Sequence, residues 1–114
     1  MDKTAKLKKY RQILQQVTEM HAKMPAEPDD VESFAVCDPV NDQYLLLDVG
    51  WEGEERAHYV VFHLRLKDGK VLIEQDGIEY GIAQDLIEAG IQEEDIVVAF
   101  GDKTSQLLNE RIAA

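Results

Sequence analysis

Between residues 31 and 75, four strand-like segments follow one another with only short turns between them. Their sequences are VESFAVCD (31–38), QYLLLDVG (43–50), AHYVVFHLRL (57–66) and VLIEQ (71–75). Sequential strands joined by short turns usually pair with each other, so the pattern predicts an antiparallel four-stranded meander. Asp68 and Gly69 give the clearest turn signal, because both residue types tolerate positive φ.

Strict alternation divides the third segment between two faces. One face carries His58, Val60, Phe62, Leu64 and Leu66. It is apolar enough to be the core face. The segment 43–50 is apolar on both faces, which indicates a central strand or a second covered face.

The first twenty-odd residues predict an amphipathic helix. The apolar stripe repeats every three or four residues, and its members are Leu7, Tyr10, Ile13, Leu14, Val17, Met20, His21 and Met24. Pro25 and Pro28 then end the helix, because proline lacks the amide that a helix interior needs. We expect the stripe to lie on the core face of the sheet.

The last third of the chain predicts a second helix within 81–91, ended by Gly90 as its C-terminal cap. A short helical turn and a β-branched strand (96–100) follow, and the tail has a weak helical pattern of Leu107, Leu108 and Ile112. The expected fold is therefore α+β. An N-terminal helix packs on an antiparallel four-stranded meander sheet, followed by a second helix and a short C-terminal strand. At 114 residues the chain is expected to form a single domain, 1–114.

Charge is distributed unevenly along the chain, whose formal net charge is −11. Residues 1–23 hold six Lys/Arg against two acids, a net +4, whereas the remaining 91 residues hold six against 21, a net −15. An acidic body repels phosphate backbones, which disfavours direct nucleic-acid contact by the sheet. The alternative is a DNA-binding protein that uses its basic N-terminal helix through Lys6, Lys8 and Lys9.

Cysteine usage and hydropathy indicate a cytoplasmic protein. The single cysteine, Cys37, cannot form an intramolecular disulfide, which fits a reducing compartment. No apolar stretch approaches a membrane span and no secretory signal precedes the first helix. Cys37 lies in a strand between apolar neighbours, where a thiol is typically inert. No glycine motif for phosphate binding is present, so no cofactor is expected.

The stretch DVGWEGEERAH (48–58) is the one candidate for an active-site loop. A metal-dependent hydrolase would require Asp48 to converge with Glu54 or Glu55. The following strand carries Arg65 where a second acid would be needed, so we expect a hairpin connection and no catalytic residue. The three histidines form no HxH or HExxH arrangement, and no metal site is expected.

Four stretches lie in order from about residue 7 to 100, namely KLKKYRQILQQV, NDQYLLLDVGWEGEERAH, DGKVLIEQDGIEYGIAQDLIEAGI and EEDIVVAF. Together they resemble the XisI family, named for the fdxN element excision controlling factor of cyanobacteria. The family typically ends in a tail resembling P-P-x-x-R-x-Y-T-G-F, and this chain has GDKTSQLLNERIAA instead.

The resemblance implies a non-enzymatic accessory role in programmed DNA element excision. The expected partner is a XisH-like protein, of a kind that resembles endonucleases, or the site-specific recombinase itself. An acidic surface suits such a partner, because it complements a basic DNA-binding surface. We expect the interface at Asp48, Trp51, Glu52, Glu54 and Glu55, with Trp51 as its anchor. The competing interpretation is that Trp51 folds back onto the core. A homodimer is also compatible with a small single-sheet domain.

Overall fold

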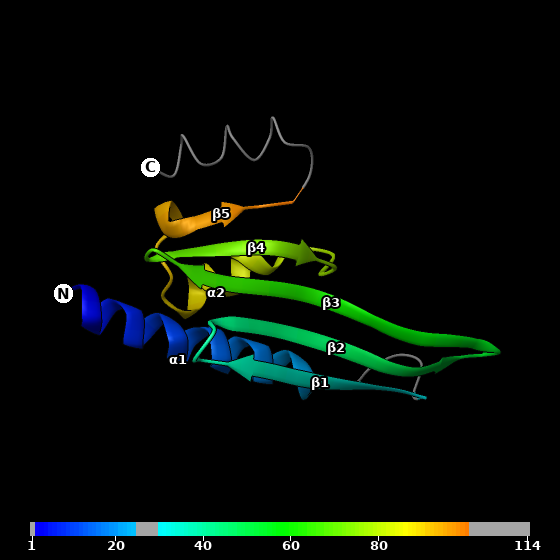
Figure 1. Cartoon of the computed structure of the whole chain (residues 1–114). Helices are drawn as coiled ribbons and strands as arrows, with labels where there is room; N and C mark the ends of the chain where they lie inside the picture. Colours follow the sequence, from blue (N-terminus) through cyan, green and yellow to red (C-terminus); the bar gives the residue numbers. More distant parts are fainter. Residues whose placement is uncertain (1, 25–29, 101–114) are drawn as a thin grey trace.

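A five-stranded mixed sheet with two helices on one side makes up the residues that this computed structural model describes, 2–24 and 30–100 (Figure 1). The elements follow the order α1 (Lys3–Ala22), β1 (Val31–Asp38), β2 (Gln43–Glu52), β3 (Glu55–Lys67), β4 (Lys70–Asp76), α2 (Ile82–Ala89), the 3₁₀ turn η1 (Glu93–Asp95) and β5 (Ile96–Val98). The spatial order of the strands is the same as their order in the sequence.

The sheet differs from the expected one in its last strand. The pairs β1–β2, β2–β3 and β3–β4 are antiparallel as predicted, but β5 joins the same sheet parallel to β4. The prediction of a four-stranded antiparallel sheet was therefore wrong. The physical reason is the connection through α2 and η1, which carries the chain back so that β5 runs in the same direction as β4. The α+β class, both helices and the short C-terminal strand are confirmed.

The hydrophobic core fills the space between the sheet and the two helices. Helix α1 contributes Tyr10, Ile13, Leu14 and Val17, as its stripe predicted. The sheet and the second helix complete the cluster with Tyr44, Leu46, Phe62, Leu64, Leu66, Val71, Ile73, Ile82, Leu86 and Ile91. The side chains of Met20 and Met24 remain 42% and 46% exposed, so the C-terminal end of the predicted stripe is not fully covered.

A β-bulge in β3 reverses the alternation on which the face assignment rested. Phe62 pairs with Leu46 and Val60 pairs with Leu47, so Val61 is an extra residue. Its carbonyl accepts the amide of Gly77 at 2.7 Å. Beyond the bulge Ala57 is buried and His58 is exposed. The assignment of His58 and Val60 to the core face was wrong, because the inserted residue turns both to the opposite side.

The turn and cap predictions are largely confirmed. Asp68 and Gly69 both have positive φ, 53° and 78°, between β3 and β4. Gly90 follows α2, and its amide bonds back to the carbonyls of Leu86 and Ile87. The prolines at 25 and 28 and the helical pattern of the tail (Leu107, Leu108, Ile112) lie outside the described residues. Neither described helix is long and apolar enough to span a membrane.

The side of the sheet away from the helices is covered by no described element, and we call it the open face. It carries apolar side chains from three adjacent strands, namely Phe34, Val36, Leu45, Leu47, Val49 and Val60. Phe34 and Val36 are 46% and 44% exposed. β2 is therefore an inner strand that is apolar on both of its faces. The described helices cover only one of these two faces.

Candidate partner interface

The β2–β3 hairpin projects beyond the end of α1 (Figure 1). Its strands are longer than predicted, because Trp51 pairs with Arg56 and Glu52 with Glu55. Only Gly53 and Glu54 form the turn, and Gly53 supplies the positive φ of 66° that such a turn requires. We call residues 51–56 the hairpin tip. All six residues are exposed.

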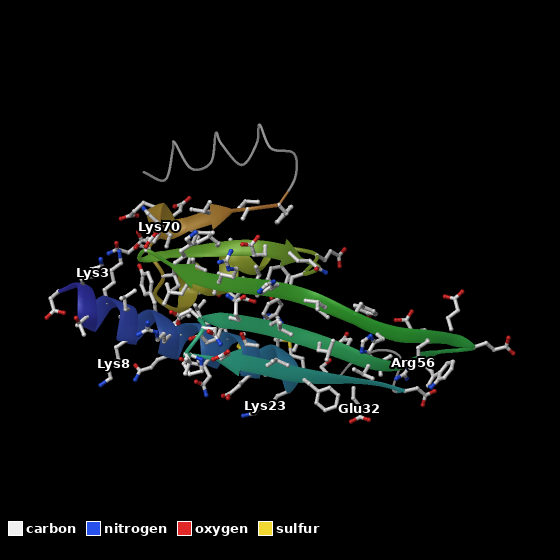
Figure 2. The ribbon with its side chains drawn as sticks, viewed as in Figure 1. Lys3, Lys8, Lys23, Glu32, Arg56 and Lys70 are labelled. Atoms are coloured by element: carbon white, nitrogen blue, oxygen red, sulfur yellow. The ribbon has the colours of Figure 1, made fainter. Side chains whose placement is uncertain are left out.

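Trp51 lies on the open-face side of the tip and is 49% exposed. The guanidinium carbon of Arg56 lies 5.4 Å from the centre of the indole ring, within cation–π range. Arg56 also donates a hydrogen bond from Nη1 to the carbonyl of Gly50 at 2.9 Å. Figure 2 shows Arg56 near the outer end of the hairpin. The indole is therefore held against its neighbouring strand and not folded into the core.

Asp48 lies on the helix side of the same strand, away from Trp51. Its Oδ1 accepts a hydrogen bond of 2.6 Å from the hydroxyl of Ser33, its pairing partner on β1. On the other side it pairs with Tyr59, whose hydroxyl donates a long bond of 3.4 Å to Glu52. Burial and the charges of Asp48 and Glu52 raise the pKa of Tyr59. The predicted interface residues thus occupy two sides of the hairpin.

Gly50 explains why LDVGW permits no larger residue at its fourth position. A Cβ at Gly50 would clash with the carbonyl oxygen of Asp30, at the start of β1. The same carbonyl accepts the amide of Trp51 at 3.1 Å. Asp48 and Gly50 therefore join the base of the hairpin to β1, and both are fold determinants of this motif.

The convergence that a metal-dependent hydrolase requires is not observed. Asp48 is bonded to Ser33, while Glu54 lies in the turn six residues further along. Within 2–24 and 30–100, no group of three or more His, Cys, Asp or Glu side chains is placed to hold a metal ion. Burial raises the pKa of the Cys37 thiol, which disfavours the reactive thiolate.

The histidines have separate environments. His21 is buried, and its Nε2 lies 2.6 Å from Oδ2 of Asp85 on α2. The same oxygen accepts a hydrogen bond of 2.7 Å from Tyr80, and this bond raises the pKa of Tyr80 to about 12. His63 lies 2.7 Å from Oε1 of Gln43. His21 and Asp85 therefore connect the two helices.

Asp95 is a buried charged residue that the sequence analysis did not single out. It is 4% exposed, and its Oδ2 accepts from Tyr10 at 2.5 Å and lies 2.8 Å from Nζ of Lys6. Lys70 lies 3.5 Å from Oδ1. Burial alone would raise the pKa of Asp95, but the hydrogen bonds from Lys6 and Tyr10 outweigh it and hold that pKa below its ordinary value. The only sequence signal was an acid directly before a β-branched run.

The ion pair between Lys6 and Asp95 affects the DNA-binding alternative, because it occupies one of the three lysines proposed to contact DNA. Lys6 points to Asp95, whereas Lys8 is exposed on the outside of α1 (Figure 2). Lys6 and Lys9 together line a small polar cavity of about 300 Å³ with Tyr10, Gly90 and Gln92. Lys8 thus lies apart from the other two lysines, and the charge of Lys6 is paired with Asp95.

The second sequence motif, IEQDG-x-E-x-GIA, organises the start of α2. Asp76 accepts the amide of Ile78 on Oδ1 and that of Ile82 on Oδ2, both at 3.0 Å. Gly77 approaches Val61 so closely that a Cβ would lie 2.7 Å from its carbonyl oxygen. The motif therefore fixes the β3 bulge and the first amide of α2 together.

Comparison with known proteins agrees with these motifs. The family described as XisI protein matches residues 1–110. The chain belongs to the XisI family. No curated protein matches it.

Two solved structures of XisI proteins have the same fold. A XisI-like protein from Anabaena variabilis ATCC 29413, solved at 1.30 Å, is 27% identical, with a TM-score of 0.79. The fdxN element excision controlling factor XisI from the same organism, solved at 2.19 Å, is 30% identical, with a TM-score of 0.72. Each comparison covers 90% of this chain and 94% of the other. These relatives come from a cyanobacterium.

Proposed function

We propose that this XisI-family chain is a non-enzymatic, cytoplasmic accessory factor in programmed DNA element excision. It acts by binding a protein partner, either a XisH-like protein of the nuclease type or the site-specific recombinase. Membership of a family that includes an excision controlling factor supports the biological setting. The observation that carries the binding role is the projecting hairpin tip, with its half-exposed Trp51 and three exposed acids, Glu52, Glu54 and Glu55.

The tip combines the two properties that favour a protein interface. A large aromatic residue held by a neighbouring strand loses little freedom on binding, and such residues are frequent anchors. The surrounding carboxylates complement a basic surface and speed the encounter with it. A nucleic-acid-binding partner carries such a basic surface, so the tip competes with DNA for that surface.

Co-expression with the XisH-like protein tests this function. We expect the two proteins to co-purify, and we expect the chain to change the rate at which its partner cleaves DNA. The double variant Glu54→Gln/Glu55→Gln should weaken co-purification, whereas Glu93→Gln/Glu94→Gln, which removes two exposed acids of η1 at the other end of the sheet, should not. Failure to co-purify with either the XisH-like protein or the recombinase would contradict the proposal.

A further inference from the structure

The open face is apolar across three paired strands. Phe34 of β1 lies beside Leu47 of β2, which in turn lies beside Val60 of β3. Val36 and Leu45 form the next row, on the side away from the hairpin tip. Contiguous exposed apolar patches of more than a few hundred Å² are rare on monomers and mark interaction sites. The described helices leave this patch uncovered, since both pack on the opposite side.

We propose that two copies of this chain pack together through their open faces, sheet on sheet. The resulting homodimer places the six apolar side chains of each copy in one shared core between two sheets about 10 Å apart. This surface adjoins the hairpin tip, because Trp51 and Arg56 lie on the same side of the sheet. Glu52 and Glu55 of the tip lie on the helix side and stay available to another partner.

The charge of the face favours a second copy as the occupant. The chain has a formal net charge of −11, so most of its surface repels another copy. On the open face, however, the acids Glu32, Asp38 and Glu74 are matched by Arg56, Arg65 and Lys67. Glu74 and Arg65 already form an ion pair of 3.0 Å. Two copies can therefore approach through this face without the repulsion that their other surfaces impose.

The distribution of residues across the face is self-complementary about a two-fold axis along β2. Such an axis lays β1 of one copy over β3 of the other, because β1 and β3 flank β2. Phe34 then faces Val60, and Glu32 faces His58, since each pair shares a row of the sheet. Edge strand β1 of one copy, which carries Glu32, thus lies over the inner strand β3 of its partner, which carries Arg56 and Arg65. Leu47, on the axis, faces its own counterpart.

The available area fits a weak, concentration-dependent dimer. The three strands that overlap under this axis, about 4.8 Å apart and about 30 Å long, present roughly 430 Å² of sheet. Two copies would bury about 860 Å² in total, which is the size of a transient interface. A basic nucleic-acid-binding partner, in contrast, finds its charge complement at the hairpin tip and not on this balanced face.

Sedimentation velocity of the full-length chain tests the dimer, at about 1 to 100 µM and about 150 mM salt. We expect a concentration-dependent dimer. Val36→Asp places a charge in the interface and should weaken dimerisation by about 30-fold or more. The control Val40→Asp makes the same change at an 88% exposed residue of the β1–β2 turn and should leave it unaltered. A wild-type monomer throughout, or equal behaviour of both variants, would overturn the proposal.

Chemical cross-linking keeps the test decisive if Val36→Asp fails to fold. Leu47→Cys places a thiol near the proposed axis, so a short bis-maleimide should join two copies. The wild-type cysteine, Cys37, lies on the helix side of the sheet, next to the core, and should not react in this way. Covalent dimers from Leu47→Cys and none from Val40→Cys are expected. No cross-link at Leu47, or an equal yield at Val40, refutes the two-fold arrangement.

Discussion

Tyr10 of α1 donates a hydrogen bond of 2.5 Å to Asp95 of η1, 85 residues later in the chain. Its oxygen also accepts the amide of Gln92 at 3.2 Å. Together with Lys6, the tyrosine satisfies a carboxylate that is almost completely buried. This contact joins the first helix to the turn that precedes the parallel strand, and so holds the two ends of the described fold together.

We predict that Tyr10→Phe lowers the free energy of unfolding by about 1–3 kcal/mol, because it leaves part of a buried carboxylate unsatisfied. Urea unfolding followed by circular dichroism measures the change. Tyr59→Phe is the matched control, since the bond of 3.4 Å from that hydroxyl to Glu52 is long and exposed. Its effect should stay within about 0.5 kcal/mol. Equal effects of the two variants would show that the Tyr10–Asp95 bond stabilises nothing.

The lowered pKa of Asp95 predicts a contribution to stability that depends on pH. The contribution is present above the unfolded pKa of about 3.9 and is lost as the pH falls through the folded value. The wild type should therefore exceed Asp95→Asn in stability at neutral pH, and the difference should shrink below about pH 4. Denaturant titrations of both proteins across this range measure it. A difference that grows on acidification contradicts the assigned pKa direction.

Lys6 and Lys8 are two residues apart but should differ in effect. Lys6→Gln removes a partner of Asp95 and is expected to cost on the order of 1 kcal/mol, a modest figure because Lys6 is a third exposed and screened by solvent. Lys8→Gln changes an exposed side chain and should leave the melting temperature unaltered. Thermal unfolding distinguishes the two. A gel shift with duplex DNA, abolished equally by both changes, would instead support the DNA-binding alternative.

Gly50 and Gly53 offer a comparison within one hairpin. Gly50→Ala forces a Cβ against the Asp30 carbonyl, so the start of β1 must move. Gly53→Ala meets no atom within 4 Å and incurs only the strain of its positive φ, about 1 kcal/mol. We expect Gly50→Ala to be the more destabilising by at least about 1 kcal/mol. Similar melting temperatures for the two variants would contradict the close contact.

The sequence predicted those features that single residues specify. Asp68 and Gly69 mark a turn because few residue types adopt positive φ, and Gly90 ends a helix for the same reason. The stripe of α1 predicted Tyr10, Leu14 and Val17 in the core, since the helical period is regular. Local chemistry is sufficient for such elements.

Features that depend on distant partners were not predictable in this way. The bulge at Val61 reverses which side chains face the core at one end of β3. It depends on the amide of Gly77, which binds the Val61 carbonyl, and the alternation along β3 does not reveal that contact. The parallel pairing of β5 depends on how α2 crosses the sheet. Asp95 appeared as one acid among three in a turn, and its role follows only from its proximity to Lys6 and Tyr10.

For the predicted interface residues, too, the sequence predicted part of the arrangement and the structure supplied the rest. Alternation places Trp51 and Asp48 on opposite faces of β2, and the structure shows what each contacts. Asp48 bonds to Ser33 within the sheet, whereas Trp51 stays half exposed beside Arg56. We therefore expect binding to depend on Trp51 and the three exposed acids, and Asp48 to act through the fold.

The affinity of the XisH-like partner for Trp51→Ala, measured by isothermal titration calorimetry, tests the proposed interface most directly. The substitution should raise Kd by about 30-fold or more, as expected for an interface anchor, without loss of folded structure. Tyr80→Ala, which removes a 61% exposed aromatic side chain outside the tip, should leave Kd unaltered. If Trp51→Ala binds with the affinity of the wild type, the hairpin tip is not the interface.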